Sequence, residues 1–147
     1  MITIEQLTFI VREASKLMVT DGFEIDQKDG FENIVTSSDV AVQNYLCKSL
    51  SVLMPDSGFL CEEKDINDSC HEYTWIIDPI DGTANYSRGI DQCAICVGLK
   101  HGEEMLMGVV FLPRTNELFH AEKGKGAFLN GKRIHVSDRG FSNAVLC

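Results

Sequence analysis

Residues 75–86 have the sequence WIIDPIDGTANY, in which an apolar run leads into two carboxylates and a tight turn. The run is nearly continuous and predicts a buried strand that ends at Asp78. The proline that follows pushes Asp78 towards extended geometry. Asp81 comes three residues later, and Gly82 permits a tight turn after it. Thr83 can then begin a short helix whose free N–H groups point back towards both carboxylates.

Two carboxylates beside the start of a helix suit a divalent metal ion that bridges to a phosphate group. Ligands that are all oxygen atoms favour a hard cation such as Mg²⁺. Glu62 and Glu63 follow another short apolar strand, and one of them is a candidate third ligand. The alternative interpretation is a solvated acidic turn, because Asp-Pro and Asp-Gly are common turn pairs. The complete string after an apolar strand favours the metal site.

Two amphipathic helices are predicted upstream of this segment. A capping-box pattern at Thr3 and apolar residues at helical spacing predict a first helix that ends at Asp21–Gly22. A polar loop, residues 26–33, separates it from the second helix. That helix begins at Ser38–Asp39 and stops at Met54–Pro55.

Extended segments joined by turns make up the rest of the chain. Asn130–Gly131 is the strongest turn signal, because both central residues of that hairpin turn need positive φ. The predicted fold is therefore α+β, with two helices packed on an antiparallel sheet, in one domain over residues 1–147. The expected strands are residues 58–61, 73–77, 94–99, 105–112, 117–121, 127–129, 134–136 and 144–146.

Composition limits the classes of function. The 147 residues are 44% hydrophobic and carry a formal net charge of -9. This acidic balance repels phosphate backbones, so we expect no nucleic-acid partner. No apolar run reaches the roughly 20 residues of a membrane helix, and no signal-peptide pattern is present, so we expect no membrane partner. Six cysteines without such a signal indicate reduced thiols and a cytoplasmic protein.

Four segments resemble the inositol monophosphatase family. Residues 75–86 resemble its signature W-x-x-D-P-x-D-G-T-x-N-[FY], and residues 36–39 resemble its T-x-x-D helix start. Residues 59–63 resemble F-[IL]-G-E-E, with Cys61 where glycine is usual, and residues 124–131 resemble the hairpin that closes the family's first half. The resemblance implies the N-terminal half of the layered αβαβα sugar-phosphatase fold.

The resemblance also implies a site for two or three Mg²⁺ ions in the complete enzyme. Glu63, Asp78 and the backbone carbonyl of Ile80 would hold the first ion. Asp78 and Asp81 would contribute to a second, and Glu63 would also touch a third. Asp81 is further expected to face the substrate.

The same resemblance assigns catalytic and phosphate-binding roles. Asp39 and Thr83 would orient and deprotonate the attacking water. Lys28 matches a loop lysine near the family's metal site. The N–H groups of Gly82, Thr83 and Ala84 would bind the phosphate.

These roles predict Mg²⁺-dependent hydrolysis of a small phosphorylated polyol or sugar by a metal-activated water, in a homodimer. Inositol monophosphate is the first expected substrate, with fructose 1,6-bisphosphate and a nucleotide 3′-phosphate as alternatives. Trp75 is the only tryptophan, so we expect the C-terminal half, with its W-D motif that completes the second metal site, to be absent. The alternative function is a catalytically incomplete fragment that binds metal weakly and self-associates without turnover.

Haloacid-dehalogenase-like phosphatase chemistry conflicts with the spacing of the two aspartates. Those enzymes carry D-x-D-G-[TV] after an apolar strand, whereas this chain has D-x-x-D-G-T. Residues two apart on a strand share a face and residues three apart do not. A regular strand would therefore place Asp78 and Asp81 on opposite faces.

Overall fold

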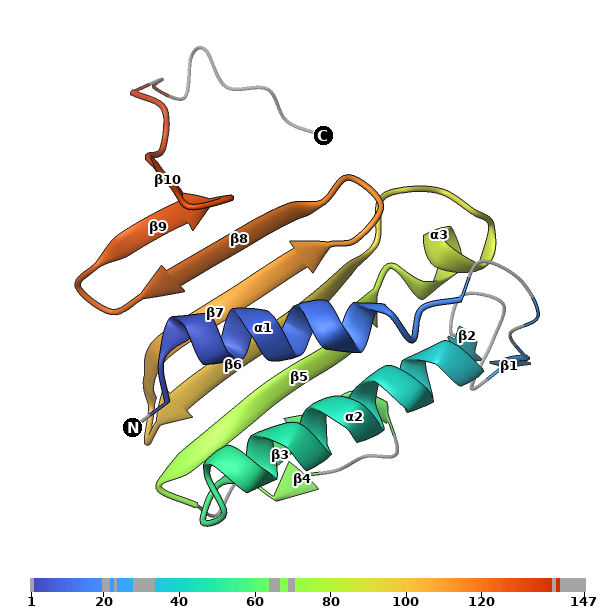
Figure 1. Cartoon of the computed structure of the whole chain (residues 1–147), viewed down its shortest axis with the longest axis horizontal. Helices are drawn as coiled ribbons and strands as arrows, with labels where there is room; N and C mark the ends of the chain where they lie inside the picture. The colour runs from blue at the N-terminus through green and yellow to red at the C-terminus, as the bar shows by residue number, and fades with distance from the viewer. Residues whose placement is uncertain are drawn as a thin grey trace.

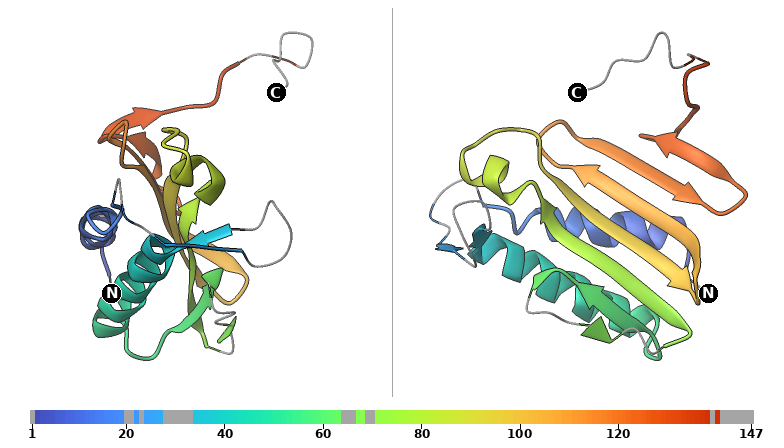
Figure 2. Two further views of the ribbon diagram at one scale, coloured as in Figure 1. Left: turned by 90° about the vertical axis from the view of Figure 1, so that its right-hand side faces the viewer. Right: turned by 180° about the vertical axis from the view of Figure 1, so that it is seen from behind.

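The computed structural model describes residues 2–19, 22, 24–27, 34–63, 67–68, 71–138 and 140. Lys28 and the expected strand at residues 144–146 lie outside these residues. Within them the fold is α+β, with two long helices on one face of a large sheet (Figure 1). The edge-on view in Figure 2 shows both helices on the same side of the sheet.

The two long helices begin with the same capping device. α1 (Ile4–Ser15) starts after Thr3, whose side chain forms the predicted capping box with Gln6. α2 (Ser37–Leu53) starts after Thr36, which forms a second capping box with Asp39. α1 ends at Ser15, earlier than the predicted stop at Asp21–Gly22, because the following N–H groups bond to carbonyls three residues back instead of four.

Eight strands form the main sheet, in the order β10-β9-β8-β7-β6-β5-β3-β4. Neighbours are antiparallel except β3 and β5, which are parallel. This parallel pairing results from β4. The chain continues from β3 into the antiparallel β4 at the sheet edge and then returns as β5 on the other side of β3. The expected antiparallel sheet is therefore mixed. The strands are β3 (Gly58–Cys61), β4 (Asn67–Asp68), β5 (Tyr73–Asp81), β6 (Ala94–His101), β7 (Glu104–Leu112), β8 (Glu117–Glu122), β9 (Gly126–Leu129) and β10 (Lys132–Ile134).

Two smaller expectations are corrected and one is confirmed. β1 (Ile25–Gln27) pairs with β2 (Ile34–Thr36), so the start of the predicted polar loop lies in a strand. The last hairpin strand is β10, which ends at Ile134, two residues short of the expected end. The Asn130–Gly131 turn has φ values of 48° and 78°, as its sequence predicts.

The hydrophobic core lies between the helices and the sheet. Leu7 of α1, Leu46 and Leu50 of α2, and Trp75 of β5 have no exposed surface. This packing fixes α2 across β5 and so brings the start of α2 to the end of β5. No helix in the described part of the chain has the length and apolarity needed to span a membrane.

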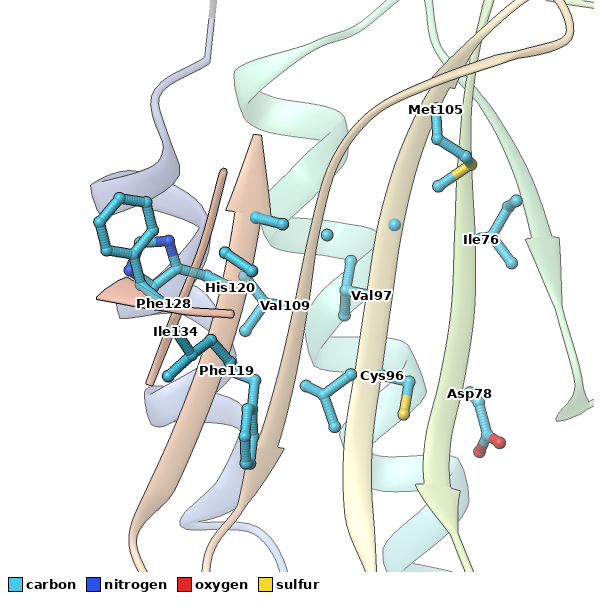
Figure 3. A pocket seen from close by; sticks show the side chains of 15 residues that line it. Ile76, Asp78, Cys96, Val97, Met105, Val109, Phe119, His120, Phe128 and Ile134 are labelled. Carbon is cyan, nitrogen blue, oxygen red and sulfur yellow. The ribbon is translucent and has the colours of Figure 1, made fainter. Parts of the chain in front are cut away.

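The opposite face of the sheet carries an open apolar groove with a volume of about 510 Å³. In Figure 3 the helices lie behind the sheet, and the side chains of Ile76, Phe119 and Phe128 stand on the side away from them. Asp78 lies at one end of the groove and is the one carboxylate among its described lining residues.

Replacing Leu50 with alanine is expected to lower the free energy of unfolding by about 2–5 kcal/mol, because the buried side chain leaves a cavity under α2. Urea denaturation followed by circular dichroism measures this change. Val52→Ala, on the exposed side of the same helix, is the matched control and is expected to change it by about 0.5 kcal/mol or less. Equal losses in both variants would contradict the burial of Leu50.

Candidate functional site

A β-bulge at the end of β5 determines how its two aspartates lie. Asp78 stands opposite Cys96 of β6, whereas Asp81 stands opposite Ala94, so three residue steps on β5 match two on β6. The bulge absorbs one residue, and both carboxylates therefore lie on one face, contrary to the expectation for a regular strand. In agreement, burial and the charges of both aspartates raise the pKa of the Cys96 thiol to about 12.

Asp78 is a partly buried acid near other carboxylates. Its Oδ1 atom is buried and has no hydrogen-bond partner among the described residues. Burial, together with the nearby charges of Glu62, Asp81 and Asp39, raises the pKa of Asp78 to about 7. A buried, unpartnered carboxylate oxygen among other carboxylates fits a cation, because a cation would offset both desolvation and repulsion.

The described residues do not show three His, Cys, Asp or Glu side chains already gathered around one point. Like charges that converge without a cation repel each other. The donor set is nevertheless present at this end of the sheet, since three carboxylates act on Asp78.

Asp39 and Thr83 are brought together, although 44 residues separate them. Asp39 is buried at the start of α2, where its Oδ2 accepts hydrogen bonds from the N–H and hydroxyl of Thr36. The Thr83 hydroxyl lies 3.0 Å from Asp39 Oδ1 and 2.9 Å from the carbonyl oxygen of Ile80, and it can donate to either. The capping box that starts α2 therefore also holds the carboxylate that faces Thr83.

Gly82 turns the chain from β5 into α3 (Thr83–Ser87). Its φ is 84°, and a Cβ atom there would lie 2.8 Å from the carbonyl oxygen of Gln92, so no side chain fits. The hydrogen bonds of α3 begin with the N–H groups of Asn85 and Tyr86, which donate to Gly82 O. The N–H groups of Thr83 and Ala84 precede these bonds, in the first turn, where helical N–H groups have no partner inside the helix.

Tyr86 ties α3 to the start of α2. Its hydroxyl donates to the Val19 carbonyl at 2.5 Å or to Ser38 Oγ at 2.9 Å. Ser38 immediately precedes Asp39, so the buried phenol of Tyr86 fixes the position of α3 relative to the start of α2.

The two adjacent glutamates have different environments. Glu62 is exposed, donates its N–H to the Ile77 carbonyl at 3.2 Å, and its charge raises the pKa of Asp78. Glu63 is buried, and its backbone N–H and carbonyl bond to the side chain of Gln43. The structure thus brings Glu62 to Asp78, although the family resemblance assigns the metal-ligand role to Glu63.

Gln43 is a positioning residue that the sequence analysis missed. Its side-chain amide donates to the Glu63 carbonyl at 2.7 Å and accepts from the Glu63 N–H at 3.0 Å. Gln43 lies one helical turn after Asp39 and is buried. The sequence feature that could have indicated this role is the polar Gln43 directly after Val42, a residue of the apolar stripe of α2.

Comparison with known proteins identifies relatives of nearly the whole chain. A family model described as the inositol monophosphatase family matches residues 3–147. An inositol-1-monophosphatase of Caulobacter vibrioides is 37% identical over 135 residues, which are 87% of this chain and 53% of that protein. A fructose-1,6-bisphosphatase/inositol-1-monophosphatase of Thermotoga maritima is 38% identical over 114 residues, 78% of this chain and 44% of that protein.

Solved structures show the same similarity in three dimensions. An extragenic suppressor protein SuhB from Bartonella henselae aligns with a TM-score of 0.86 at 30% identity, over 92% of this chain and 55% of that one. An IMPase of Thermotoga maritima aligns with a TM-score of 0.83 at 33% identity, over the same shares. The chain therefore spans about half the length of the relatives it matches.

Gln43→Ala is expected to destabilise the fold by about 2–4 kcal/mol, because it removes two buried hydrogen bonds to the backbone N–H and carbonyl of Glu63. Thermal or urea unfolding measures the loss. Asn44→Ala, on the exposed neighbouring position, is the control and is expected to leave stability nearly unchanged. A loss no larger than that of the control would show that the amide contributes nothing.

The raised pKa of Asp78 predicts a pH dependence of stability in the absence of divalent cations. Between its ordinary value of 3.8 and about 7, the folded state binds more protons at Asp78 than the unfolded state. Stability is therefore expected to fall as pH rises through this window. The fall should be smaller in Asp78→Asn, measured by urea denaturation at several pH values with EDTA, and unchanged in the exposed control Asp56→Asn. Parallel curves for wild type and Asp78→Asn would contradict the assignment.

Proposed function

The chain belongs to the inositol monophosphatase family, and from this premise we propose that it forms the metal-binding part of a Mg²⁺-dependent phosphatase acting on a small phosphate monoester. The observation that carries the proposal is the buried, unpartnered Oδ1 atom of Asp78 among neighbouring carboxylates, beside the Asp39–Thr83 pair. Inositol monophosphate is the proposed substrate, in keeping with the name of the Caulobacter relative. The Thermotoga relative's name supports fructose 1,6-bisphosphate as the alternative.

The proposed Mg²⁺ ligands are Asp78, Asp81, the carbonyl oxygen of Ile80 and one carboxylate of the Glu62–Glu63 pair. These are oxygen atoms, the donors that Mg²⁺ prefers. Bound Mg²⁺ would supply charge neutralisation at the phosphoryl group and a lower pKa for a nearby water.

The proposed roles of the other residues follow from their contacts. When the Thr83 hydroxyl donates to Asp39, the lone pairs of Thr83 Oγ1 face away from that bond. Thr83 Oγ1 can then accept a proton from the attacking water. Asp39 can then take up the proton that passes through Thr83. The N–H groups of Gly82, Thr83 and Ala84 would donate to phosphate oxygens, which are favoured at the start of a helix.

Three further proposals rest on the family rather than on a contact. Lys28 would add a positive charge near the metal site. The complete protein would be a homodimer and would act in the cytoplasm. Two or three Mg²⁺ ions would bind per complete site.

A second candidate function is favoured by the open apolar groove on the sheet. In this alternative the chain binds Mg²⁺ weakly, associates with itself through the groove and does not turn over substrate. Size-exclusion chromatography with light scattering, run beside the activity assay, distinguishes the two functions.

Phosphate release from inositol 1-phosphate, with and without Mg²⁺, tests the main proposal. Mg²⁺-dependent release is expected from the wild-type chain, together with a loss of at least about 100-fold in Asp78→Asn. Asp56→Asn, at an exposed aspartate that lies at the opposite end of β3 from Glu62, is expected to keep full activity. A wild-type chain that is folded and binds Mg²⁺ but releases no phosphate would favour the second function.

Calorimetric titration with Mg²⁺ separates the two glutamates. Glu62→Gln is expected to weaken binding by about tenfold or more, because Glu62 carries one of the charges that act on Asp78. Glu63→Gln leaves the backbone contacts with Gln43 in place and so measures the contribution of the Glu63 side chain alone. A larger loss in Glu63→Gln than in Glu62→Gln would assign the ligand to Glu63, as the family resemblance implies.

A further inference from the structure

Helix α2 and strand β3 carry two free thiols that face each other. Cys47 Sγ and Cys61 Sγ are 3.6 Å apart. Cys61 is 6% exposed, whereas Cys47 is only partly buried. Cys47 lies one helical turn after Gln43. The face of α2 that hydrogen-bonds to the backbone of Glu63 therefore also carries this thiol.

The geometry needs little change to become a disulfide. An S–S bond is about 2.05 Å long, so the sulfur atoms must approach by about 1.5 Å. In the described part of the chain, β3 has the two-residue β4 on its outer side, paired at Phe59 and Leu60. A strand held so lightly on one side can move by this amount more easily than a strand in the middle of the sheet.

The other described cysteines are not paired in this way. Cys93 packs with Ile80 and Tyr86, while Cys96 lies in the apolar groove opposite Asp78. Among the four cysteines described, the thiol contact is therefore between Cys47 and Cys61, and not between Cys93 and Cys96, which are close in sequence as C-x-x-C.

We propose that Cys47 and Cys61 are an oxidation site that forms a reversible disulfide between α2 and β3. The oxidant is a peroxide. Cys47 Sγ attacks the O–O bond of hydrogen peroxide and becomes a sulfenic acid as hydroxide leaves. The Cys61 sulfur then displaces the sulfenic oxygen, which departs as water, so two thiols and one peroxide give one disulfide and two waters.

Cys47 is the thiol that reacts first because it is the more exposed of the two. A hydrogen bond from the Cys61 thiol lowers the pKa of Cys47, which favours the same order. The disulfide would join α2 to the strand that leads directly into Glu62 and Glu63. The proposal concerns the thiols alone and does not rest on the phosphatase function.

Peptide mapping without reductant tests the proposal directly. Trypsin cleaves after Lys28, Lys48 and Lys64, so Cys47 lies in residues 29–48 and Cys61 in residues 49–64, each the single cysteine of its peptide. The folded chain is treated with hydrogen peroxide, its remaining thiols are alkylated, and it is digested. The expected product is the two peptides joined, with a mass equal to their sum less two hydrogen atoms, and separated again by dithiothreitol.

Variants and a size check make the result specific. Cys96→Ser, a half-buried cysteine outside the pair, is expected to retain the 29–48/49–64 link, whereas Cys47→Ser and Cys61→Ser are expected to lose it. The link should be found in the monomer band of a non-reducing gel. The proposal is overturned if both peptides are recovered unlinked after the peroxide has been consumed, or if the link occurs only in a disulfide-bonded dimer. Because the wild-type chain alone decides this, a variant that fails to fold does not obscure the outcome.

Discussion

The organisation of the site depends on one irregularity of the backbone, the bulge that lets three steps along β5 match two along β6. Without it, Asp78 and Asp81 would lie on opposite faces of the sheet. With it, both carboxylates face the same side, and Gly82 can turn the chain at once towards Thr83. The bulge thus converts a linear motif into a cluster of charges, whose mutual repulsion adds to burial in raising the pKa of Asp78.

Several side chains around the bulge both stabilise the fold and position groups of the candidate site. The carboxylate of Asp39 caps α2 and also faces Thr83, and the amide of Gln43 fills a core position while it holds the backbone of Glu63. Packing of α2 on β5 through buried leucines sets the distance between these groups. A change in the core under α2 would therefore move Asp39 and Gln43 together.

Much of this arrangement could be predicted from sequence because it is local. The capping box at Thr3, the Asn130–Gly131 turn and the short helix after Gly82 each depend on a few adjacent residues. The parallel pairing of β3 with β5 could not be predicted, because it depends on the two-residue strand β4. The bulge and the different environments of Glu62 and Glu63 depend on strand register, which the residue pattern near Asp78 does not specify.

The apolar groove and the charged site are physically coupled, because Asp78 belongs to both. Covering the groove would remove water from one side of Asp78. The effective dielectric around its carboxylate would then fall, and an uncompensated charge there would become costlier. A bound cation would offset part of this cost, since its attraction to the carboxylates would be screened less. Burial of this sheet face and binding of a divalent cation should therefore favour each other, and each measured alone should be weaker than when both occur together.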